Sequence, residues 1–189
     1  MKIGLFFGSF NPMHVGHKII ASYMVEFMDL DKVCFIVSPQ NPEKNKSSLL
    51  DQYHRLQIIR HEIEDENKLI VSDIEFTLPV PSYTIDTLSV LKEKYPKNDF
   101  SLIMGSDNIK SLHKWKNYKE ILKYHRIYVY PREGHKLSMV DKNIYYVNNV
   151  PKMEISASFI RSSIKEQKDV SYLVPEKAWS YIEKMNFYK

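Results

Sequence analysis

Two histidines three positions apart have the residue type and spacing to bind phosphate groups. His14 and His17 follow an apolar segment that ends at Gly8, and they lie where a helix is expected to begin. Residues three apart on a helix are neighbours on its surface. The free N–H groups and the positive end of the dipole at a helix N-terminus attract anions. Together these features predict a site for a polyphosphate.

Small residues in the same segment favour close approach of a ligand to the backbone. Gly8 permits an unusual backbone angle directly after the strand, and Ser9 offers a backbone N–H and a hydroxyl group. Gly16 is expected to leave room for a ligand beside the helix. An accidental pair of surface histidines is the alternative interpretation. A metal site is disfavoured because the segment contains no cysteine or acidic residue.

A second candidate phosphate-binding segment, residues 155–161, lies far along the chain. Ser156 is a favourable N-cap residue, so a helix is expected to begin beside it. Arg161 follows about one and a half turns later. A guanidinium group binds phosphate oxygens bidentately and stays charged. Taken alone, the segment is more typical of an ordinary capped surface helix, but its pairing with the histidine segment favours phosphate binding.

The elements that must position these residues alternate between short apolar segments and amphipathic ones. Strands are expected over 3–7, 33–37, 69–71, 100–104, 127–130 and 144–147, and helices over 14–28, 56–63, 84–95, 156–166 and 175–185. This alternation predicts an α/β fold, a Rossmann-like doubly wound and mainly parallel sheet with helices on both faces. Such sheets bind ligands beyond the carboxyl ends of their strands. The loops at 8–17, 38–48, 105–108 and 131–134 are therefore expected at one edge.

Length and composition are consistent with that fold. The 189 residues predict a single domain, with an α/β core over 1–150 and a helical part over 151–189. The lone cysteine, Cys34, excludes a disulfide framework and is expected to be an inert core thiol. No apolar run is long enough to span a membrane and no signal peptide is recognised, so a cytoplasmic protein is expected. The net charge of +4 suits a nucleotide ligand and does not by itself indicate a nucleic acid partner.

The two phosphate-binding segments resemble those of a known superfamily. Residues 8–17 resemble the signature of the nucleotidyltransferases with the His-x-Gly-His motif, and residues 155–161 resemble their Ile-Ser-x-x-x-x-Arg segment. The sequence departs from the usual pattern at Asn11, where aspartate is common, and at Ala157, where a hydroxyl residue is common. Because asparagine and aspartate serve similarly in turns, the first departure mainly affects roles that need a negative charge.

Four further segments narrow the resemblance to the family of bacterial nicotinate-mononucleotide adenylyltransferases. They are residues 39–46, 81–88, 105–108 and 129–134, and the resemblance extends from residue 1 to about 165. It implies adenylyl transfer from ATP to nicotinate mononucleotide, which forms deamido-NAD and pyrophosphate. At position 116, after Trp115, this chain has a lysine where many members have an aromatic or other residue.

The resemblance also implies roles for individual residues. His14, His17 and Arg161 are the implied catalytic residues, with His17 and Arg161 near the pyrophosphate and His14 near the transferred phosphate. The implied ATP-binding residues are Gly8, Ser9, Phe10, Gly16, Asp107, Arg132, Ser156 and Ser158. The implied mononucleotide-binding residues are Lys44, Lys46, Tyr83, Thr84 and Trp115. Mg²⁺ is the expected cofactor, held mainly by ATP and water without dedicated protein ligands.

Several alternatives stay open at this point. One alternative is that the acceptor is nicotinamide mononucleotide or phosphopantetheine instead of nicotinate mononucleotide. Another is that the chain is a cytidylyltransferase. An alternative from a different functional class is a nucleotide-binding module without catalysis. The presence of His14, His17 and Arg161 disfavours it. No nucleic acid or membrane partner is expected, and the oligomeric state, homo-oligomers included, is open.

Overall fold

A six-stranded parallel sheet forms the centre of the protein, whose computed structural model describes residues 1–39, 49–134 and 139–189. The strands are β1 (Lys2–Gly8), β2 (Lys32–Val37), β3 (Leu69–Ser72), β4 (Asp99–Gly105), β5 (Ile127–Tyr130) and β6 (Ile144–Tyr146). Their order is β3-β2-β1-β4-β5-β6, and every neighbouring pair is parallel. The predicted Rossmann-like α/β fold is confirmed.

Helices connect the strands and continue to the C-terminus. They are α1 (Val15–Phe27), α2 (Gln52–Ile63), α3 (Thr84–Lys94), α4 (Ser106–Ile109), α5 (Tyr118–Tyr124), α6 (Ala157–Lys165) and α7 (Glu176–Lys184), with 3-10 turns η2 (Ile74–Thr77), η3 (Leu112–Lys114) and η4 (Ser171–Leu173). The sequence prediction missed α4, α5 and the 3-10 turns η2, η3 and η4, and it treated 105–108 as a loop. These elements are too short to show an apolar period of their own.

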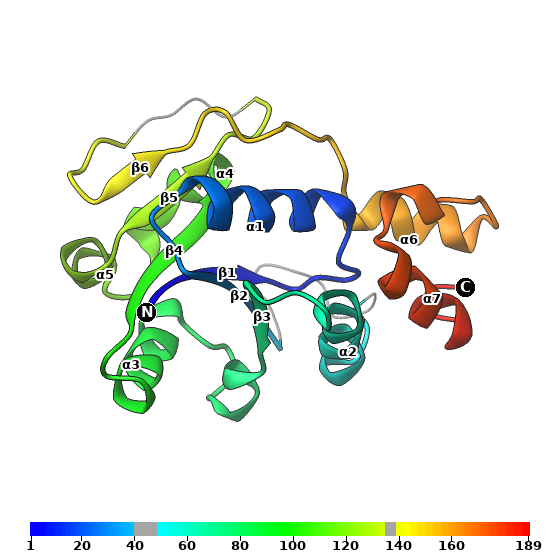
Figure 1. Ribbon diagram of the computed structural model, residues 1–189, viewed down its shortest axis with the longest axis horizontal. Helices are drawn as coiled ribbons and strands as arrows, with labels where there is room; N and C mark the ends of the chain where they lie inside the picture. The colour runs from blue at the N-terminus through cyan, green and yellow to red at the C-terminus, as the bar shows by residue number, and fades with distance from the viewer. Residues whose placement is uncertain (40–48, 135–138) are drawn as a thin grey trace.

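Alternate side chains of each strand pack on opposite faces of the sheet. In β1, Leu5 belongs to a buried cluster with Leu88 of α3, whereas Phe6 belongs to a second cluster with Met24 of α1. Figure 1 shows α1 and α3 on the two sides of the sheet. Both faces are therefore covered, which explains why the central strands are apolar throughout.

The strand order reverses between β1 and β4, which are neighbours at the centre of the sheet. All strands are parallel, so their carboxyl ends lie at one edge, as expected for the described loops after Gly8 and Gly105. Helix α6 lies at the end of the molecule where β1 ends and α1 begins (Figure 1). The reversal point is where doubly wound sheets form ligand crevices.

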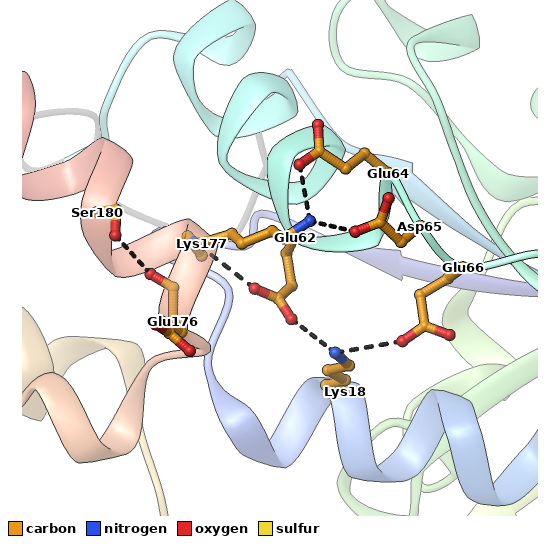
Figure 2. Close-up of polar contacts among 9 residues, drawn as sticks. Lys18, Glu62, Glu64, Asp65, Glu66, Glu176, Lys177 and Ser180 are labelled. Atoms are coloured by element: carbon orange, nitrogen blue, oxygen red, sulfur yellow. Dashed lines mark hydrogen bonds and ion pairs between the residues drawn. The ribbon is translucent and has the colours of Figure 1, made fainter.

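The last helix is held against the rest of the chain by buried and charged contacts. Ala178 and Ile182 of α7 belong to the buried cluster that contains Phe6. Figure 2 shows the charged contacts: Lys177 pairs with Glu64 at 2.8 Å and with Asp65, both just after α2. Helix α7 is therefore fixed to the end of α2.

The Cys34 thiol is buried, and burial raises its pKa to about 12, as expected for an inert core thiol. Across the described ranges, no helix combines the length and apolar character that a bilayer span requires. The division at residue 150 and the cytoplasmic location stay predictions.

Candidate active site

The two histidines lie against each other at the start of α1. Their rings are stacked, with centroids 3.7 Å apart and planes inclined by 27°. The backbone N–H of His14 donates to Nδ1 of His17 at 3.2 Å, so the proton of a neutral His17 is on Nε2. His14 is the N-cap residue of the helix, not a member of its first turn. The predicted proximity of the two histidines is confirmed, although His14 immediately precedes the helix and only His17 lies in its first turn.

His14 presents a neutral imidazole to the site. Only 5% of the His14 surface is exposed to solvent. Burial, and secondarily the charge of Arg132, lowers the pKa of His14 to about 4, so the ring is uncharged at neutral pH. In the part of the chain that the structure describes, no group forms a hydrogen bond with its Nδ1. A buried polar atom of this kind is suited to a hydrogen bond with a bound ligand.

Gly8 at the end of β1 and Gly16 in the first turn of α1 make room for the rings of Phe10 and His14. Gly8 does not have the predicted unusual backbone angle; the positive φ in this turn, 46°, occurs at Phe10 instead. A Cβ at Gly8 would come within 2.8 Å of the Phe10 ring. A Cβ at Gly16 would come within 3.1 Å of His14 Nδ1, so the space predicted for a ligand contains the His14 ring. Both glycines therefore permit the packing that orients the histidines.

Arg161 of α6 reaches the turn between β1 and α1. Its Nη1 donates to the backbone carbonyl of Asn11 at 2.7 Å, and its Nη2 donates to Ser158 Oγ at 3.4 Å. Ser156 caps α6 by accepting the Phe159 N–H at 3.1 Å. The two phosphate-binding segments predicted from opposite ends of the sequence therefore converge.

Asn11, the position where aspartate is more common in the resembled family, connects three parts of the chain. Its Oδ1 accepts the Leu50 N–H at 3.2 Å and the Tyr188 hydroxyl at 2.9 Å. Its backbone carbonyl accepts Arg161. A carboxylate oxygen accepts the same two hydrogen bonds, so these contacts require an acceptor and not a negative charge.

One groove contains three of the predicted ATP-binding residues. Asp107, Arg132 and Ser156 line a hollow of about 670 Å³ beyond β4 and β5. The Arg132 backbone N–H donates to Ser106 Oγ at 2.7 Å, which joins the loop after β5 to α4. A Cβ at Gly105 would overlap the Asp107 carboxylate. Gly105 therefore permits Asp107 to lie against the end of β4.

A second cleft contains the described residues predicted to bind the mononucleotide. Tyr83, Thr84 and Trp115 line a hollow of about 300 Å³ together with Gly8 and Ser9. Thr84 is the first residue of α3, as predicted, so the free N–H groups of a helix N-terminus lie at this cleft. The predictions for Lys44 and Lys46 fall outside the described residues.

Lys116, noted in the sequence as a departure, also lines this cleft. Its Nζ lies 5.0 Å from the centre of the Tyr83 ring and is ion-paired with Asp86 at 2.9 Å. Asp86 is in the first turn of α3. The ion pair therefore joins the segment after Trp115 to the start of α3.

Sequence reasoning missed Glu75, a buried carboxylate of the same cleft. Its Oε2 accepts the Ser82 hydroxyl at 2.9 Å and its Oε1 accepts the Thr87 hydroxyl at 2.8 Å. The two donors lie on either side of the Tyr83-Thr84 pair, so Glu75 holds the start of α3 in place. Glu75 is in the 3-10 turn η2, which has no periodic pattern to reveal its inward side chain.

Sequence reasoning also missed Arg55, which is fully buried at 0% exposure. It donates to four backbone carbonyls, at 2.6 to 3.1 Å, those of Ser9, Ser38, Pro39 and Leu50. Burial lowers the pKa of Arg55 to about 10, which still leaves it charged at neutral pH. Arg55 and Glu62 are seven residues apart among the buried positions of α2. Two charged residues at this spacing, on the same face as the apolar residues of the helix, were the signal in the sequence that could have revealed a buried Arg55.

The chain is similar in sequence to known proteins over its whole length. The family model described as "Cytidylyltransferase-like" matches residues 5–163. A protein of Flavobacterium johnsoniae named "Probable nicotinate-nucleotide adenylyltransferase" is 55% identical over 192 residues and covers 100% of both chains. One of Christiangramia forsetii with the same name is 52% identical and covers 100% of this chain and 98% of its own.

Solved structures have the same fold. The nicotinic acid mononucleotide adenylyltransferase of Plasmodium falciparum, described as complexed with NaAD, superposes with a TM-score of 0.81. It is 21% identical, and the match covers 99% of this chain and 97% of that one. A structure from Vibrio parahaemolyticus has a TM-score of 0.74 at 22% identity, with 99% and 94% coverage.

Proposed function

The chain belongs to the cytidylyltransferase-like family, and from this premise we propose that it transfers the adenylyl group of ATP to nicotinate mononucleotide. This activity is nicotinate-nucleotide adenylyl transfer in NAD biosynthesis, with deamido-NAD and pyrophosphate as products. The observation that carries the proposal is that consecutive residues of α4 line two different hollows. Asp107 lines the first and Asn108 lines the second, which also reaches Ser9 of the histidine turn.

The reaction requires little covalent chemistry from the protein. An anionic phosphate oxygen of the mononucleotide attacks the α-phosphorus of ATP, a new P–O bond forms, and the bond to the β-phosphate breaks. Because the nucleophile is already charged, no general base is needed. Catalysis comes from aligning the reacting groups and from stabilising the charge that accumulates on the departing pyrophosphate.

The groups around the turn supply that stabilisation. Arg161, whose guanidinium contacts the Asn11 carbonyl, and His17 act on the pyrophosphate. His14 acts on the transferred phosphate as a neutral hydrogen-bonding group, since the pKa of its ring is lowered to about 4. Hydrogen-bond donors held in place before the reaction stabilise developing charge without further reorganisation.

ATP occupies the groove beyond β4 and β5. Asp107 lies by the ribose, Arg132 by the adenosine, and Ser156 and Ser158 at the start of α6 lie by the phosphates. The backbone of 8–10 and Gly16 borders the phosphates on the other side. The shared groove of Asp107, Arg132 and Ser156 supports this placement.

Nicotinate mononucleotide occupies the cleft beside α3. The indole of Trp115 stacks on the electron-poor pyridine ring. The N-terminus of α3 at Thr84 receives the carboxylate, because free helix N–H groups favour an anion. Tyr83 borders the ring, and Lys44 and Lys46 contribute positive charge to the phosphates.

Mg²⁺ enters with ATP in this proposal. Within the described ranges, no three His, Cys, Asp or Glu side chains gather as a metal site. The ATP groove is lined by the carboxylate residues Asp107, Glu133 and Glu154, which do not gather as a metal site, and this fits an ion held mainly by phosphate oxygens and water. Such an ion lowers the repulsion between the two anionic substrates. The oligomeric state, homo-oligomers included, stays open.

A pyrophosphate-release assay tests the proposal. The purified protein is mixed with Mg-ATP and, separately, with nicotinate mononucleotide, nicotinamide mononucleotide or phosphopantetheine. We expect release with nicotinate mononucleotide. Release with another acceptor alone would reassign the substrate, and no release with any acceptor would favour a nucleotide-binding module.

A further inference from the structure

We propose that Tyr188, in the segment that follows α7, is a positioning residue for adenylyl transfer that acts through Asn11 to hold Arg161 at the phosphate site. The inference depends on the proposed role of Arg161. It extends the site to a residue that lies outside the stretch matched by the family model, which ends at residue 163.

A continuous set of hydrogen bonds joins the two residues. The Tyr188 hydroxyl donates to Asn11 Oδ1 at 2.9 Å. The backbone carbonyl of the same Asn11 accepts Arg161 Nη1 at 2.7 Å. One residue therefore receives Tyr188 on its side chain and Arg161 on its backbone. A shift of Asn11 changes both contacts at once.

The second contact of Asn11 connects this set to the buried Arg55. Asn11 Oδ1 also accepts the Leu50 N–H at 3.2 Å, and the Leu50 carbonyl accepts Arg55 Nε at 2.8 Å. Arg55 in turn binds the Ser9 carbonyl in the histidine turn at 2.6 Å. The turn is thus held by Arg55 at Ser9 and by Tyr188 at Asn11.

The Tyr188 hydroxyl is in a setting that keeps it a donor. Burial raises the pKa of Tyr188 well above its usual range, although the nearby charges of Arg161 and Arg55 oppose that shift. The phenol therefore keeps its proton wherever the enzyme is assayed, and Asn11 Oδ1 is the acceptor it finds. Tyr188 and Arg161 also line one hollow together, which places the phenol beside the proposed phosphate-binding guanidinium.

The segment that carries Tyr188 is anchored, so the contact is not that of a frayed chain end. The Phe187 ring lies 4.7 Å from the His54 ring and 5.8 Å from the Tyr181 ring, measured between centroids. Helix α7 itself is fixed by Lys177 and by Glu62, whose Oε2 accepts the Ala178 N–H at 3.4 Å (Figure 2). An anchored segment is able to restrain Asn11.

A tyrosine-to-phenylalanine pair tests the proposal. Tyr188→Phe removes only the hydroxyl that reaches Asn11, and we expect kcat to fall about fivefold, the effect of one lost neutral hydrogen bond, with an unchanged KM for nicotinate mononucleotide. Tyr181→Phe is the matched control, because it removes a hydroxyl of α7 that contacts His54 Nδ1 at 3.3 Å instead. We expect its kcat to stay at the wild-type value. Thermal unfolding of both variants checks that they fold.

A double-mutant cycle shows whether Tyr188 acts through Arg161. Arg161→Lys keeps a positive charge and residual activity but lacks the planar guanidinium. In that background, Tyr188→Phe is expected to lower kcat less than twofold, because the two changes affect one interaction. An undiminished fivefold loss there, an unchanged kcat for Tyr188→Phe alone, or an equal loss for Tyr181→Phe would each overturn the inference.

These outcomes are distinct from failure of the proposed function. If the wild-type protein releases no pyrophosphate with nicotinate mononucleotide, or if Arg161→Lys has full activity, the role proposed for Arg161 is wrong. If the wild-type protein is active, Arg161→Lys has reduced activity and only Tyr188→Phe has no effect, the proposed function stands and the role of Tyr188 is wrong.

Discussion

The backbone N–H of His14 donates to Nδ1 of His17 at 3.2 Å while the two imidazole rings are stacked. The two histidines nevertheless have different properties. His17 has an assigned tautomer with its proton on Nε2, and His14 is a buried neutral ring whose pKa is lowered to about 4. The two residues are therefore expected to respond differently to substitution.

Replacing His17 tests its proposed role on the pyrophosphate. We expect His17→Ala to lower kcat by roughly 10²–10³, which is typical for the loss of one donor that is held in place before the reaction. Steady-state pyrophosphate release measures the effect. His61→Ala, at an exposed position of α2, is the control and is expected to keep wild-type kcat. Near-normal turnover of His17→Ala would contradict the assignment.

The lowered pKa of His14 predicts a pH-dependent stability. The unfolded chain takes up a proton near the ordinary value of 6.5, whereas folded His14 does so only near 4. Its contribution is therefore complete above pH 6.5 and lost as the pH falls toward 4, with about 2 kcal/mol lost between pH 7 and pH 5. Urea unfolding of wild type and His14→Asn at both pH values measures it. The variant is expected to lose less stability, and equal losses would count against the prediction.

Gly105→Ala tests the position of Asp107. The added methyl group would overlap the Asp107 carboxylate, so the side chain must move away from the end of β4. We expect KM for ATP to rise about tenfold, because the loss of a hydrogen bond to a charged group is worth roughly that much. KM for nicotinate mononucleotide serves as the internal comparison and is expected to stay constant.

A second glycine of the same edge provides the control for that substitution. Gly134 has a φ of 70° and nothing within 4 Å of an added Cβ. Gly134→Asn is expected to keep the wild-type KM for ATP, since asparagine tolerates this conformation. A similar rise in both variants would show that the effect is general and not due to Asp107.

Glu75 is expected to control binding of the mononucleotide. Glu75→Ala leaves the Ser82 and Thr87 hydroxyls without their buried acceptor and frees the start of α3, so KM for nicotinate mononucleotide is expected to rise about tenfold. KM for ATP is expected to change little. Glu75→Gln keeps one acceptor oxygen and should have an intermediate KM. Equal effects on both substrates would exclude a role specific to this cleft.

Removal of Mg²⁺ is expected to stop the reaction without affecting the fold. The described residues contain no cluster of metal-binding side chains, so the ion is expected to be carried by ATP. Excess EDTA should abolish pyrophosphate release and leave the melting temperature of the nucleotide-free protein unchanged. A lower melting temperature would indicate a metal held by the protein itself.

Local patterns were sufficient for much of the fold. The apolar period of strands and helices predicted the six described strands and the five longer helices within a few residues. The cap at Ser156 and the helix start at Thr84 also followed from local residue preferences. The four-residue α4 did not, because one helical turn has no period to detect.

The sequence by itself determined the element types, the resemblance to the nucleotidyltransferases and the residues of both phosphate-binding segments, because these depend on neighbours along the chain. Only the tertiary structure decided what holds those segments together. Arg55, Glu75 and Tyr188 bind partners that lie far away along the chain or carry no recognisable motif. Which backbone carbonyl or hydroxyl meets a buried side chain depends on how the elements pack, and a local pattern holds no information about that.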